Sequence, residues 1–310
     1  SRGGHVVCYN TISRVADGIS YPGRDSDIYG NDIFEVTDDA VETDRGWANV
    51  RVWGNRMSNY GAYALSFQPM NCGPWYFVRN QIISTIHQDT EVRRPGVFKF
   101  RVQDRFALLN NTIVFPHGLD LNGGCDALLR AMVRNNLFIS STGRKPLWTA
   151  YRHRNKDGTL KQPTYTVPIY RPDWRTDVDY NGYDWGLDPG RNEYVFRHEL
   201  PDVFKRTTFN DLESWSSSVG VDKHSIRLKK EEVFEKWEVP ADIGPVGPIF
   251  LTLEKDGAAI DAGSPLPNAI GTWTGKAPDL GCHESGAPLP HYGARDGKTL
   301  KDHARYWALF

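Results

Sequence analysis

An acidic stretch near the N-terminus carries the densest group of side chains that could do chemistry. Residues 37–44 read TDDAVETD and place four carboxylates within eight positions. If Val41 points into a core, the alternation of a β-strand puts Glu42 and Asp44 on one outer face. Paired carboxylates of this kind act as acid and base, or as acid and nucleophile, in the cleavage of sugar polymers. The candidate catalytic carboxylates are therefore Asp38, Asp39, Glu42 and Asp44.

Neighbouring stretches supply basic and aromatic side chains that complement these acids. A basic group runs from residue 93 to residue 101, a histidine follows in the sequence FPHG, and Arg51 and Trp53 share an outward face of an alternating stretch. An acid that faces a base is the arrangement that a glycan-cleaving site requires. The further catalytic candidates are Arg93, Lys99 and His117. The candidate substrate-binding residues are Asp17, Arg51, Trp53, Gln68 and Arg94.

Two reactions fit such a group of residues. In β-elimination on a uronic acid, carboxylates bind Ca²⁺ or another cation, the metal and an Arg neutralise the sugar carboxylate, and an Arg, Lys or His removes the C5 proton. The candidate calcium ligands are then Asp38, Asp39 and Glu42. In hydrolysis, two carboxylates flank the scissile bond instead. The sequence does not choose between these reactions.

The same residues also have a purely structural interpretation. Asp in a β-turn commonly accepts hydrogen bonds from backbone amides, and a run of carboxylates can be a solvated edge or a structural calcium site. A basic loop usually faces solvent. The catalytic interpretation requires that the carboxylates converge on one spot with a basic side chain within reach for proton transfer.

An internal repeat indicates the elements that must position these residues. Six times an Asn is followed, after one residue, by an aliphatic or aromatic side chain, at separations of 21, 24, 25, 31 and 25 residues. Short alternating stretches precede several of these Asn. Such a period is typical of a right-handed parallel β-helix, in which each coil buries its apolar face only by stacking on its neighbours. The repeated residues are Asn10, Asn31, Asn55, Asn80, Asn111 and Asn136.

Asparagine has a physical reason to recur at these turns. It tolerates the left-handed conformation, and its side-chain amide can bond the equivalent amide one coil above or below. A ladder of such amides would hold the coils in register. The alternative is a Gly-rich β-sandwich in which Asn turns recur by chance.

The predicted fold is all-β: a right-handed parallel β-helix with long loops, one short helix and an irregular C-terminal tail. Coils occupy residues 1–140, and the basic residues 141–175 form a long loop excursion of the kind that walls a ligand groove. Residues 176–310 hold a last coil, a short helix near residues 210–220 and a Pro-rich tail that packs on the solenoid. Because the first repeat begins within ten residues of the start, we expect an uncapped first coil that earlier coils or another chain complete.

Composition limits the classes of function. The 310 residues carry 37 basic and 38 acidic side chains, so the net charge of −1 offers no global field that would attract nucleic acid. The mean hydropathy is −0.53, and no apolar run reaches the roughly 18 residues of a membrane-spanning helix. Aromatic residues make up 12% of the chain, which suits a surface that binds sugars. The four cysteines have no metal-ligand spacing and are expected as free thiols rather than disulfides.

Several of these stretches together resemble a large bacterial group of secreted right-handed parallel β-helix repeat proteins. The resemblance covers most of the chain. It is carried by residues 4–10 (GHVVCYN), 17–19 (DGI), 38–44, 49–52, 68–69 and 73–80 (GPWYFVRN), and by the tail segments 259–267 and 275–284.

Proteins of this group are similar to pectate-lyase-like polysaccharide lyases and hydrolases, and the resemblance implies a secreted or periplasmic enzyme that acts on a polysaccharide. The chain departs from two related patterns, because it lacks the Gly-His-Gly of polygalacturonases and an epimerase-like Asp-Pro-His. We expect a lyase that acts by β-elimination, with glycoside hydrolysis as the alternative. A non-catalytic surface or tail protein that binds glycan, and a structural protein that stacks through its first coil, stay open as different classes.

Overall fold

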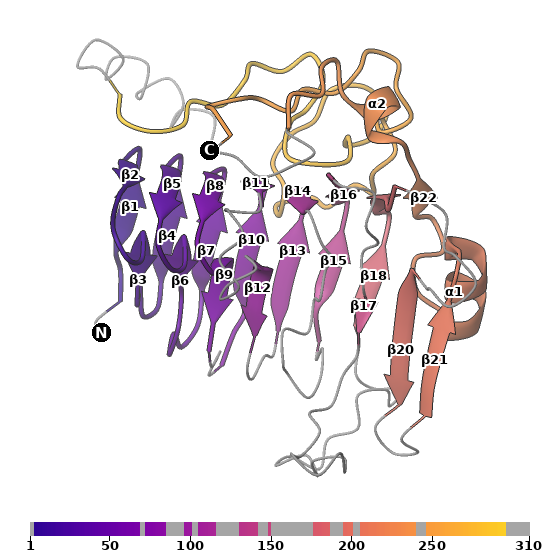
Figure 1. The fold of residues 1–310 in the computed structure, drawn as a ribbon, viewed down its shortest axis with the longest axis horizontal. Helices are drawn as coiled ribbons and strands as arrows, with labels where there is room; N and C mark the ends of the chain where they lie inside the picture. The colour runs from indigo at the N-terminus through magenta and orange to yellow at the C-terminus, as the bar shows by residue number, and fades with distance from the viewer. Residues whose placement is uncertain are drawn as a thin grey trace.

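The computed structural model is built almost entirely of short β-strands (Figure 1). Among the described residues these strands form three parallel sheets and one small mixed sheet, joined by turns and two short helices. The described residues are 3–68, 72–84, 96–100, 105–115, 130–141, 148–149, 176–186, 195–200, 205–239 and 246–295.

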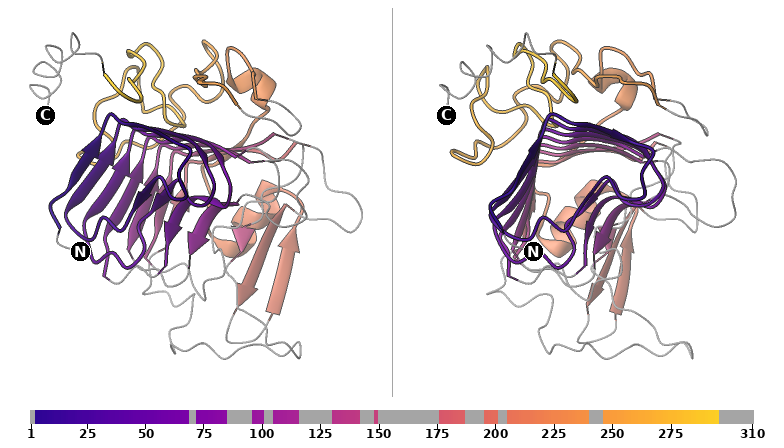
Figure 2. Two further views of the ribbon diagram at one scale, coloured as in Figure 1. Left: turned by 60° about the vertical axis from the view of Figure 1, so that its left-hand side comes forward. Right: turned by 90° about the vertical axis from the view of Figure 1, so that its left-hand side faces the viewer.

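The three parallel sheets run side by side, and successive strands of each sheet come from successive turns of the chain (Figure 2). Sheet 1 contains β1 (Val6–Cys8), β4 (Ser26–Tyr29), β7 (Val50–Trp53), β10 (Trp75–Val78), β13 (Phe106–Leu109), β15 (Met132–Arg134) and β18 (Asp177–Asp179). Sheet 2 contains β2 (Thr11–Ser13), β5 (Asp32–Val36), β8 (Arg56–Tyr60), β11 (Gln81–Ile83), β14 (Thr112–Phe115), β16 (Leu137–Ser140), β19 (Gly182–Asp184) and β22 (Ile226–Arg227). Sheet 3 contains β3 (Ile19–Ser20), β6 (Val41–Glu42), β9 (Tyr63–Phe67) and β12 (Gly96–Phe100).

A stretch of chain that gives one strand to sheet 1 and the following strand to sheet 2 is called a rung below. Equivalent positions of neighbouring rungs pair in parallel, so that Val7, Ile28, Val52 and Phe77 align across four strands of sheet 1. The predictions of an all-β fold and of parallel strands are confirmed. The sheets do not close on one another, and their stacking is consistent with a parallel β-helix.

All six repeated asparagines lie in one column, at the bend between the sheet 1 and sheet 2 strands of each rung. The Oδ1 of each later member accepts hydrogen bonds from the backbone N–H and from the Nδ2 of the Asn one rung earlier, at 2.9 to 3.1 Å. The Nδ2 group also donates to a backbone carbonyl, as Asn80 does to Val52 at 2.9 Å. Asn181 extends this Asn ladder by one further rung.

The structure corrects one detail of the predicted turn. The left-handed conformation falls on the residue before the ladder Asn, as at Tyr9, Arg79 and Tyr180, which have φ values of 53°, 53° and 55°. The physical reason is the direction of the backbone, because the N–H of the ladder Asn must point along the column at the next Oδ1. A left-handed residue just ahead of it turns the chain into that direction.

The helix α1 (Leu212–Val219) confirms the helix that the sequence predicts near residues 210–220. Asp211 caps its N-terminus by accepting a backbone N–H at 2.7 Å, and Gly220 ends it with a φ of 84°. The buried ring of Trp215 stacks on Phe196 at a centroid separation of 5.1 Å. The helix therefore packs its apolar side on the far end of the stack.

A second helix, α2 (Lys230–Val233), differs from the prediction of one helix. It is four residues long, and its N-cap Lys229 makes no side-chain capping bond. The sequence therefore gave no capping signal that would have marked it. None of the described helices is long and apolar enough to cross a membrane.

The predicted excursion over residues 141–175 lies mostly outside the described residues. From it, β17 (Trp148–Thr149) pairs in parallel with β20 (Phe196–Leu200), which pairs antiparallel with β21 (Lys205–Phe209). Of the cysteines, Cys8, Cys72 and Cys282 are free thiols, and Cys125 lies outside the described residues.

The C-terminal tail packs along the outer face of sheet 2 through side-chain amides. Asn59 both donates to and accepts from the backbone of Val246, at 3.0 and 2.9 Å. Asn135 bonds the backbone of Ser264 in the same two-way manner, at 2.9 and 2.8 Å. Each amide therefore pairs with the tail backbone as a neighbouring strand would, which fixes an irregular segment to a regular sheet.

We predict that Asn80→Ala destabilises the protein by about 4 kcal/mol, because it removes two bonds from Asn80 and leaves the buried N–H and Nδ2 of Asn55 without their acceptor. Asn10→Ala is the matched control. Its amide lies exposed at the start of the ladder, so we expect a loss of about 1 kcal/mol or less. Urea unfolding measures both, and equal losses would contradict a ladder that depends on burial.

Candidate functional site

Sheet 3 brings the predicted acidic stretch together with residues from three other turns of the chain. Its inner face is apolar, since Ile19, Val41 and Leu65 align and are buried. The neighbouring positions on the other face therefore form one row across the four strands, called the sheet 3 row below. It consists of Ser20, Glu42, Ser66 and Lys99.

Asp39 lies in the bend just before β6 and is almost completely buried, with 1% of its surface exposed. Its Oδ1 accepts the N–H of Tyr63 at 3.1 Å, and its Oδ2 lies 2.9 Å from Nζ of Lys99. Burial raises the pKa of Asp39 above its ordinary value, and the bond and charge of Lys99 oppose that shift. The ion pair joins residues that are 60 positions apart in the sequence.

Lys99 is held as a positive charge. Burial would lower its pKa, but the hydrogen bond and the charge of Asp39 outweigh burial and raise the pKa above its ordinary value. Its Nζ also lies 5.9 Å from the ring centroid of Tyr63, which adds a cation–π contact. An ammonium with a raised pKa is a poor base at neutral pH. Lys99 is therefore better suited to fix a negative charge than to remove a proton.

Glu42 and Asp44 provide two carboxyl groups in different environments. Burial, followed by the charges of Asp44 and Asp17, raises the pKa of Glu42, and a bond from Ser20 opposes the shift. Asp44 instead accepts two hydrogen bonds on Oδ1, from Ser66 Oγ at 2.8 Å and from Gln68 N at 2.6 Å. Burial among negative charges favours the protonated form of Glu42. The two carboxyl groups therefore differ in their surroundings, because Glu42 lies among negative charges and Asp44 is held by two hydrogen-bond donors.

Asp17, Asp38 and Asp39 could hold a metal ion. One ligand atom from each lies within 4.8 Å of the other two, and Asp17 Oδ1 also accepts the N–H of Asp39 at 3.2 Å. An all-oxygen set fits a hard cation such as Ca²⁺. A cation here would compete with the Lys99 ammonium for the carboxylate of Asp39. The group contains Asp17 where the sequence suggested Glu42 as a ligand.

Arg51 and Trp53, two predicted substrate-binding residues, lie on the outer face of sheet 1 rather than in the sheet 3 row. Arg51 Nε donates to Asp27 Oδ1 at 2.6 Å, and Trp53 Nε1 donates to the same oxygen at 3.3 Å. Trp53 also stacks on Tyr29, with ring centroids 4.2 Å apart. Asp27 thus holds both side chains, and the structure does not bring them together with the acidic stretch.

The remaining predicted residues divide into two groups. Gln68 joins the site through its backbone, because its N–H binds Asp44. Arg93, Arg94 and His117 lie outside the described residues. Sequence reasoning did not single out Ser20, Ser66 or Tyr63. The parallel register finds Ser20 and Ser66, since both align with Glu42. Tyr63 is found only through its contacts with Asp39 and Lys99.

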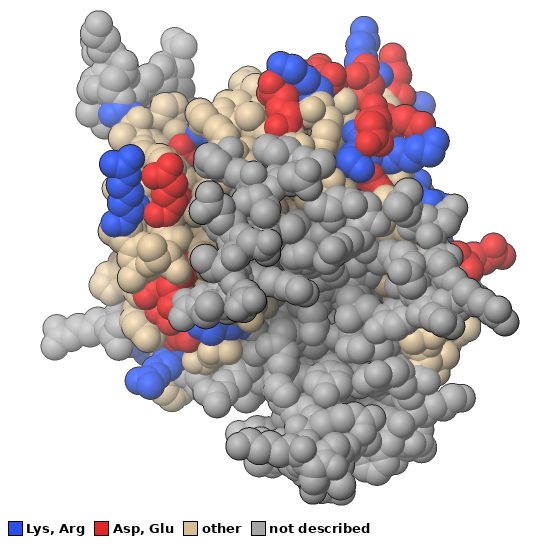
Figure 3. Space-filling model, in the orientation of Figure 1, with Lys and Arg blue, Asp and Glu red and all other residues tan. Residues whose placement is uncertain are grey.

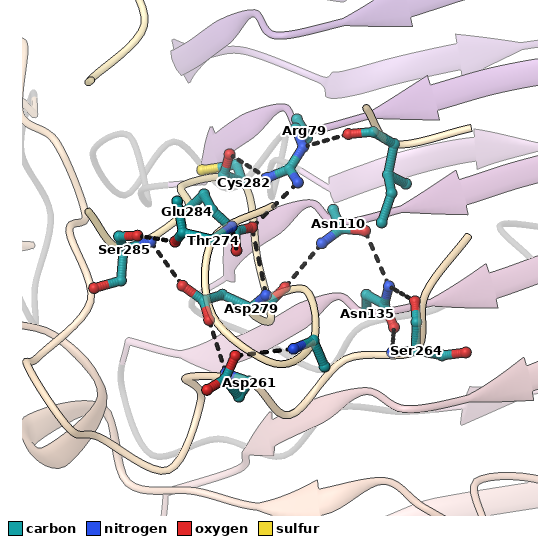
Figure 4. A network of polar contacts seen from close by, with 12 residues as sticks. Arg79, Asn110, Asn135, Asp261, Ser264, Thr274, Asp279, Cys282, Glu284 and Ser285 are labelled. Carbon is teal, nitrogen blue, oxygen red and sulfur yellow. Dashed lines mark hydrogen bonds and ion pairs between the residues drawn. The ribbon is translucent and has the colours of Figure 1, made fainter. Parts of the chain in front are cut away.

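A second group of acidic residues lies in the tail and is occupied by structural bonds (Figure 4). Asp279 accepts the N–H groups of Asp261 and Ser285, at 2.7 and 2.6 Å, and Glu284 lies 3.3 Å from Nη2 of Arg79. The backbone N–H of Ala277 lowers the pKa of Asp261. These carboxylates fasten the tail segment that carries part of the family resemblance, and the sheet 3 row is the better candidate site.

Charged side chains of both signs are interspersed on the face shown in Figure 3, most densely over α2 and the adjoining tail. Three lysine–glutamate pairs of this region show the pattern: Lys229 with Glu232, Lys230 with Glu231, and Lys236 with Glu238. The coloured residues of this face therefore form no large patch of a single sign.

Comparison with protein families found no family model that matches, and comparisons with curated proteins and with solved structures found no match either.

We predict that Glu42→Gln stabilises the protein relative to wild type as the pH rises. The pKa of Glu42 is raised above its ordinary 4.5, so the folded state binds this proton more tightly than the unfolded state does. That contribution is complete at low pH and is lost as the pH rises through the folded pKa, and Gln does not titrate. The difference in Tm between variant and wild type should therefore grow as the pH rises above the ordinary pKa of 4.5.

Glu35→Gln is the matched control, because Glu35 is exposed and its carboxylate lies 3.3 Å from Nε of the exposed Arg14. A pH-independent Tm difference for Glu42→Gln would show that the carboxyl group of Glu42 ionises in the folded protein as it does in water.

Proposed function

We propose that this protein is a carbohydrate-active enzyme that cleaves glycosidic bonds of a polysaccharide bound across sheet 3. The observation that supports this proposal is the sheet 3 row with the carboxylates beside it: a protonatable Glu42, a hydrogen-bonded Asp44, and the Asp39–Lys99 ion pair. Four strands at a spacing of about 4.8 Å make this row about 14 Å long, which is the length of a short oligosaccharide.

We further infer that the three sheets are the faces of a right-handed parallel β-helix of the pectate-lyase-like type. The order of strands supports this, since each rung adds one strand to sheet 1 and the next strand to sheet 2. Crossovers between parallel strands of one sheet are right-handed in about 98% of cases. In such a fold a polymer lies across the strands and meets side chains from successive rungs. A secreted or periplasmic location follows if the substrate is an extracellular glycan.

Hydrolysis is the reaction that the described residues support best. Glu42, with its raised pKa, donates a proton to the leaving oxygen, and Asp44, held by hydrogen bonds from Ser66 and Gln68, acts as base or nucleophile. The Lys99 ammonium offsets the charge of Asp39 at the edge of the row. These three roles need no residue beyond those described.

Elimination is the second candidate, and the positive charge of Lys99 favours it. A uronate carboxylate could bind Lys99, and Ca²⁺ on Asp17, Asp38 and Asp39 would neutralise it further. This reaction needs a base for the C5 proton, and the candidates for that role are Arg93 and His117. Lys99 itself is unsuited to it because its pKa is raised. If the sheet 3 row binds a glycan but does not cleave it, the protein would be a non-catalytic glycan-binding protein.

We predict that Glu42→Gln lowers turnover at least about 100-fold, because it removes the proton donor. A panel of uronate-containing and neutral polysaccharides is read for new reducing ends and for the ultraviolet absorbance of an unsaturated uronate in the same samples. Reducing ends without that absorbance are expected. Both signals rising together would assign elimination instead, and Glu35→Gln should leave the rate within about twofold. Full activity of Glu42→Gln would place the site elsewhere.

We predict that exhaustive chelation leaves the hydrolysis rate within about twofold, because Lys99 already supplies a positive charge to Asp39. Activity before and after chelation, and after Ca²⁺ is restored, is the measurement. A large loss that Ca²⁺ reverses, and that Asp17→Asn reproduces, would assign the cation a role in the reaction.

A further inference from the structure

The Asn ladder is closed differently at the two ends of the stack. At the far end the ladder is closed by side chains, because Asn181 N donates to Ser225 Oγ at 2.8 Å and its Nδ2 donates to Asp222 at 3.4 Å. Asp222 is itself buried and accepts Trp215 Nε1 at 2.9 Å, beneath α1. The last Asn of the ladder therefore finds its partners within the described residues.

The first rung has no such closure in the part of the chain that the structure describes. β1, β2 and β3 are the outermost strands of sheets 1, 2 and 3, and each pairs with a described strand on one side only. Figure 2, right, looks on to this end. None of the three strands carries Lys or Pro, the residues by which natural edge strands avoid pairing. The edge is thus able to accept another strand.

The core column is only partly covered at this end. Val7 and Ile12 are only partly buried, whereas the residues that align with them one rung later, Ile28 and Ile33, are fully buried. Exposed large apolar side chains gather on the same rung. Val6, Val15 and Tyr21 expose 60%, 40% and 50% of their surfaces, and they are three of the five described residues of this kind.

The ladder has a direction, and this direction identifies what would fit the edge. In the contacts between ladder asparagines, each Asn donates its backbone N–H and one Nδ2 hydrogen toward the far end, and its Oδ1 accepts from the Asn of the rung before it. Asn10 donates to Asn31, but no donor reaches its Oδ1 from the described residues. The missing partner must therefore present a backbone N–H and an Nδ2 group at the same spacing, which is what a ladder Asn on a parallel strand presents.

A second copy of this chain does not meet that requirement. Two copies joined first rung to first rung would set Asn10 Oδ1 against Asn10 Oδ1, which brings two acceptors together. A copy joined by its far end would present α1 and the closed cluster of Asp222 and Ser225. Neither contact supplies the donors.

We propose that the edge of the first rung is a docking surface for one further rung, a polypeptide segment outside residues 1–310 that runs parallel to β1 and β2 and carries an Asn followed after one residue by an aliphatic side chain. Its Asn donates to Asn10 Oδ1, its apolar side chains cover Val7 and Ile12, and its strands add to sheets 1 and 2 by β-augmentation. This inference does not depend on the proposed function.

A peptide that copies residues 26–36 (SDIYGNDIFEV) is the probe, with Asn31→Ala as its matched control. We expect the parent peptide to bind at least about tenfold more tightly than the control, by fluorescence anisotropy, because two hydrogen bonds to Asn10 are lost. Asn10→Ala in the protein should remove this preference, and its folding is reported independently by urea unfolding.

Amide exchange locates the contact. The carbonyl of His5 accepts the N–H of Asp27, and the N–H of Tyr9 donates to the carbonyl of Tyr29, so both groups face β4. Because the N–H groups of a strand alternate in direction, those of Val6 and Cys8 point to the open edge. Exchange at these two amides should slow at least about tenfold when the parent peptide binds, and amides of β7 should not change. Equal binding of the two peptides would overturn the proposal. Dimerisation of the protein without peptide, with the amides of Val6 and Cys8 protected from exchange, would also overturn the proposal, because a second copy would then be the occupant.

A second experiment, in which the added rung is covalently linked to the chain, tests the proposal if the free peptide does not bind. The chain is extended before Ser1 by a copy of residues 26–48, which places the copied Asn31 before Asn10 within the range of 21 to 45 residues that separates ladder asparagines. The extension should raise the Tm by several degrees, and the same extension with Asn31→Ala should raise it less. Identical Tm values for the two extensions would overturn the proposal.

Discussion

A column of asparagine amides, each bonded to the next, is the interaction on which the rest of the structure depends. From Asn31 to Asn136, every Oδ1 accepts two hydrogen bonds and every Nδ2 donates to the next ladder Asn and to a backbone carbonyl. These amides are buried, and a buried polar group without a partner costs about 1 to 3 kcal/mol. A slip of one residue in any rung would break several bonds at once, so the column fixes the register of sheets 1 and 2. The loops between rungs can then differ in length without moving the strands.

The register that the ladder fixes is also what assembles the candidate site. Glu42, Ser66 and Lys99 belong to different turns of the chain and meet because their strands pair in parallel. Burial then differentiates the acids. The Lys99 ammonium offsets the charge of Asp39, donors from Ser66 and Gln68 hold Asp44, and Glu42 is left among negative charges with a raised pKa. The chemistry proposed for the row follows from this contrast.

Because the ladder presents acceptors at one end and donors at the other, its two ends cannot be closed in the same way. At the far end its last donors meet Ser225 and Asp222, and α1 covers the apolar column with Trp215. At the near end it offers an acceptor on Asn10 and two partly buried aliphatic side chains. The tail covers the outer face of sheet 2 along the stack, so the first rung differs from the others in its edge rather than in its faces. The proposed docking surface is a consequence of the polarity of one column of amides.

The sequence by itself determined the parallel all-β architecture, the Asn column and the helix α1, because each is recorded locally, in a repeated tripeptide, in strand alternation, or in a cap such as Asp211 and a stop such as Gly220. Only the tertiary structure decided which outward side chains share a surface. Ser20, Glu42 and Ser66 lie 10, 11 and 11 residues after their ladder Asn, but Lys99 lies 19 residues after Asn80, so its alignment with Ser66 cannot be counted from the ladder. The alternation of a strand records only that a side chain points outward, and not over which sheet. The sequence therefore placed Arg51 and Trp53 with the acids, whereas the structure binds them to Asp27 on sheet 1 and pairs Lys99 with Asp39. Burial, which sets the state of Glu42, likewise exists only once the rungs are stacked.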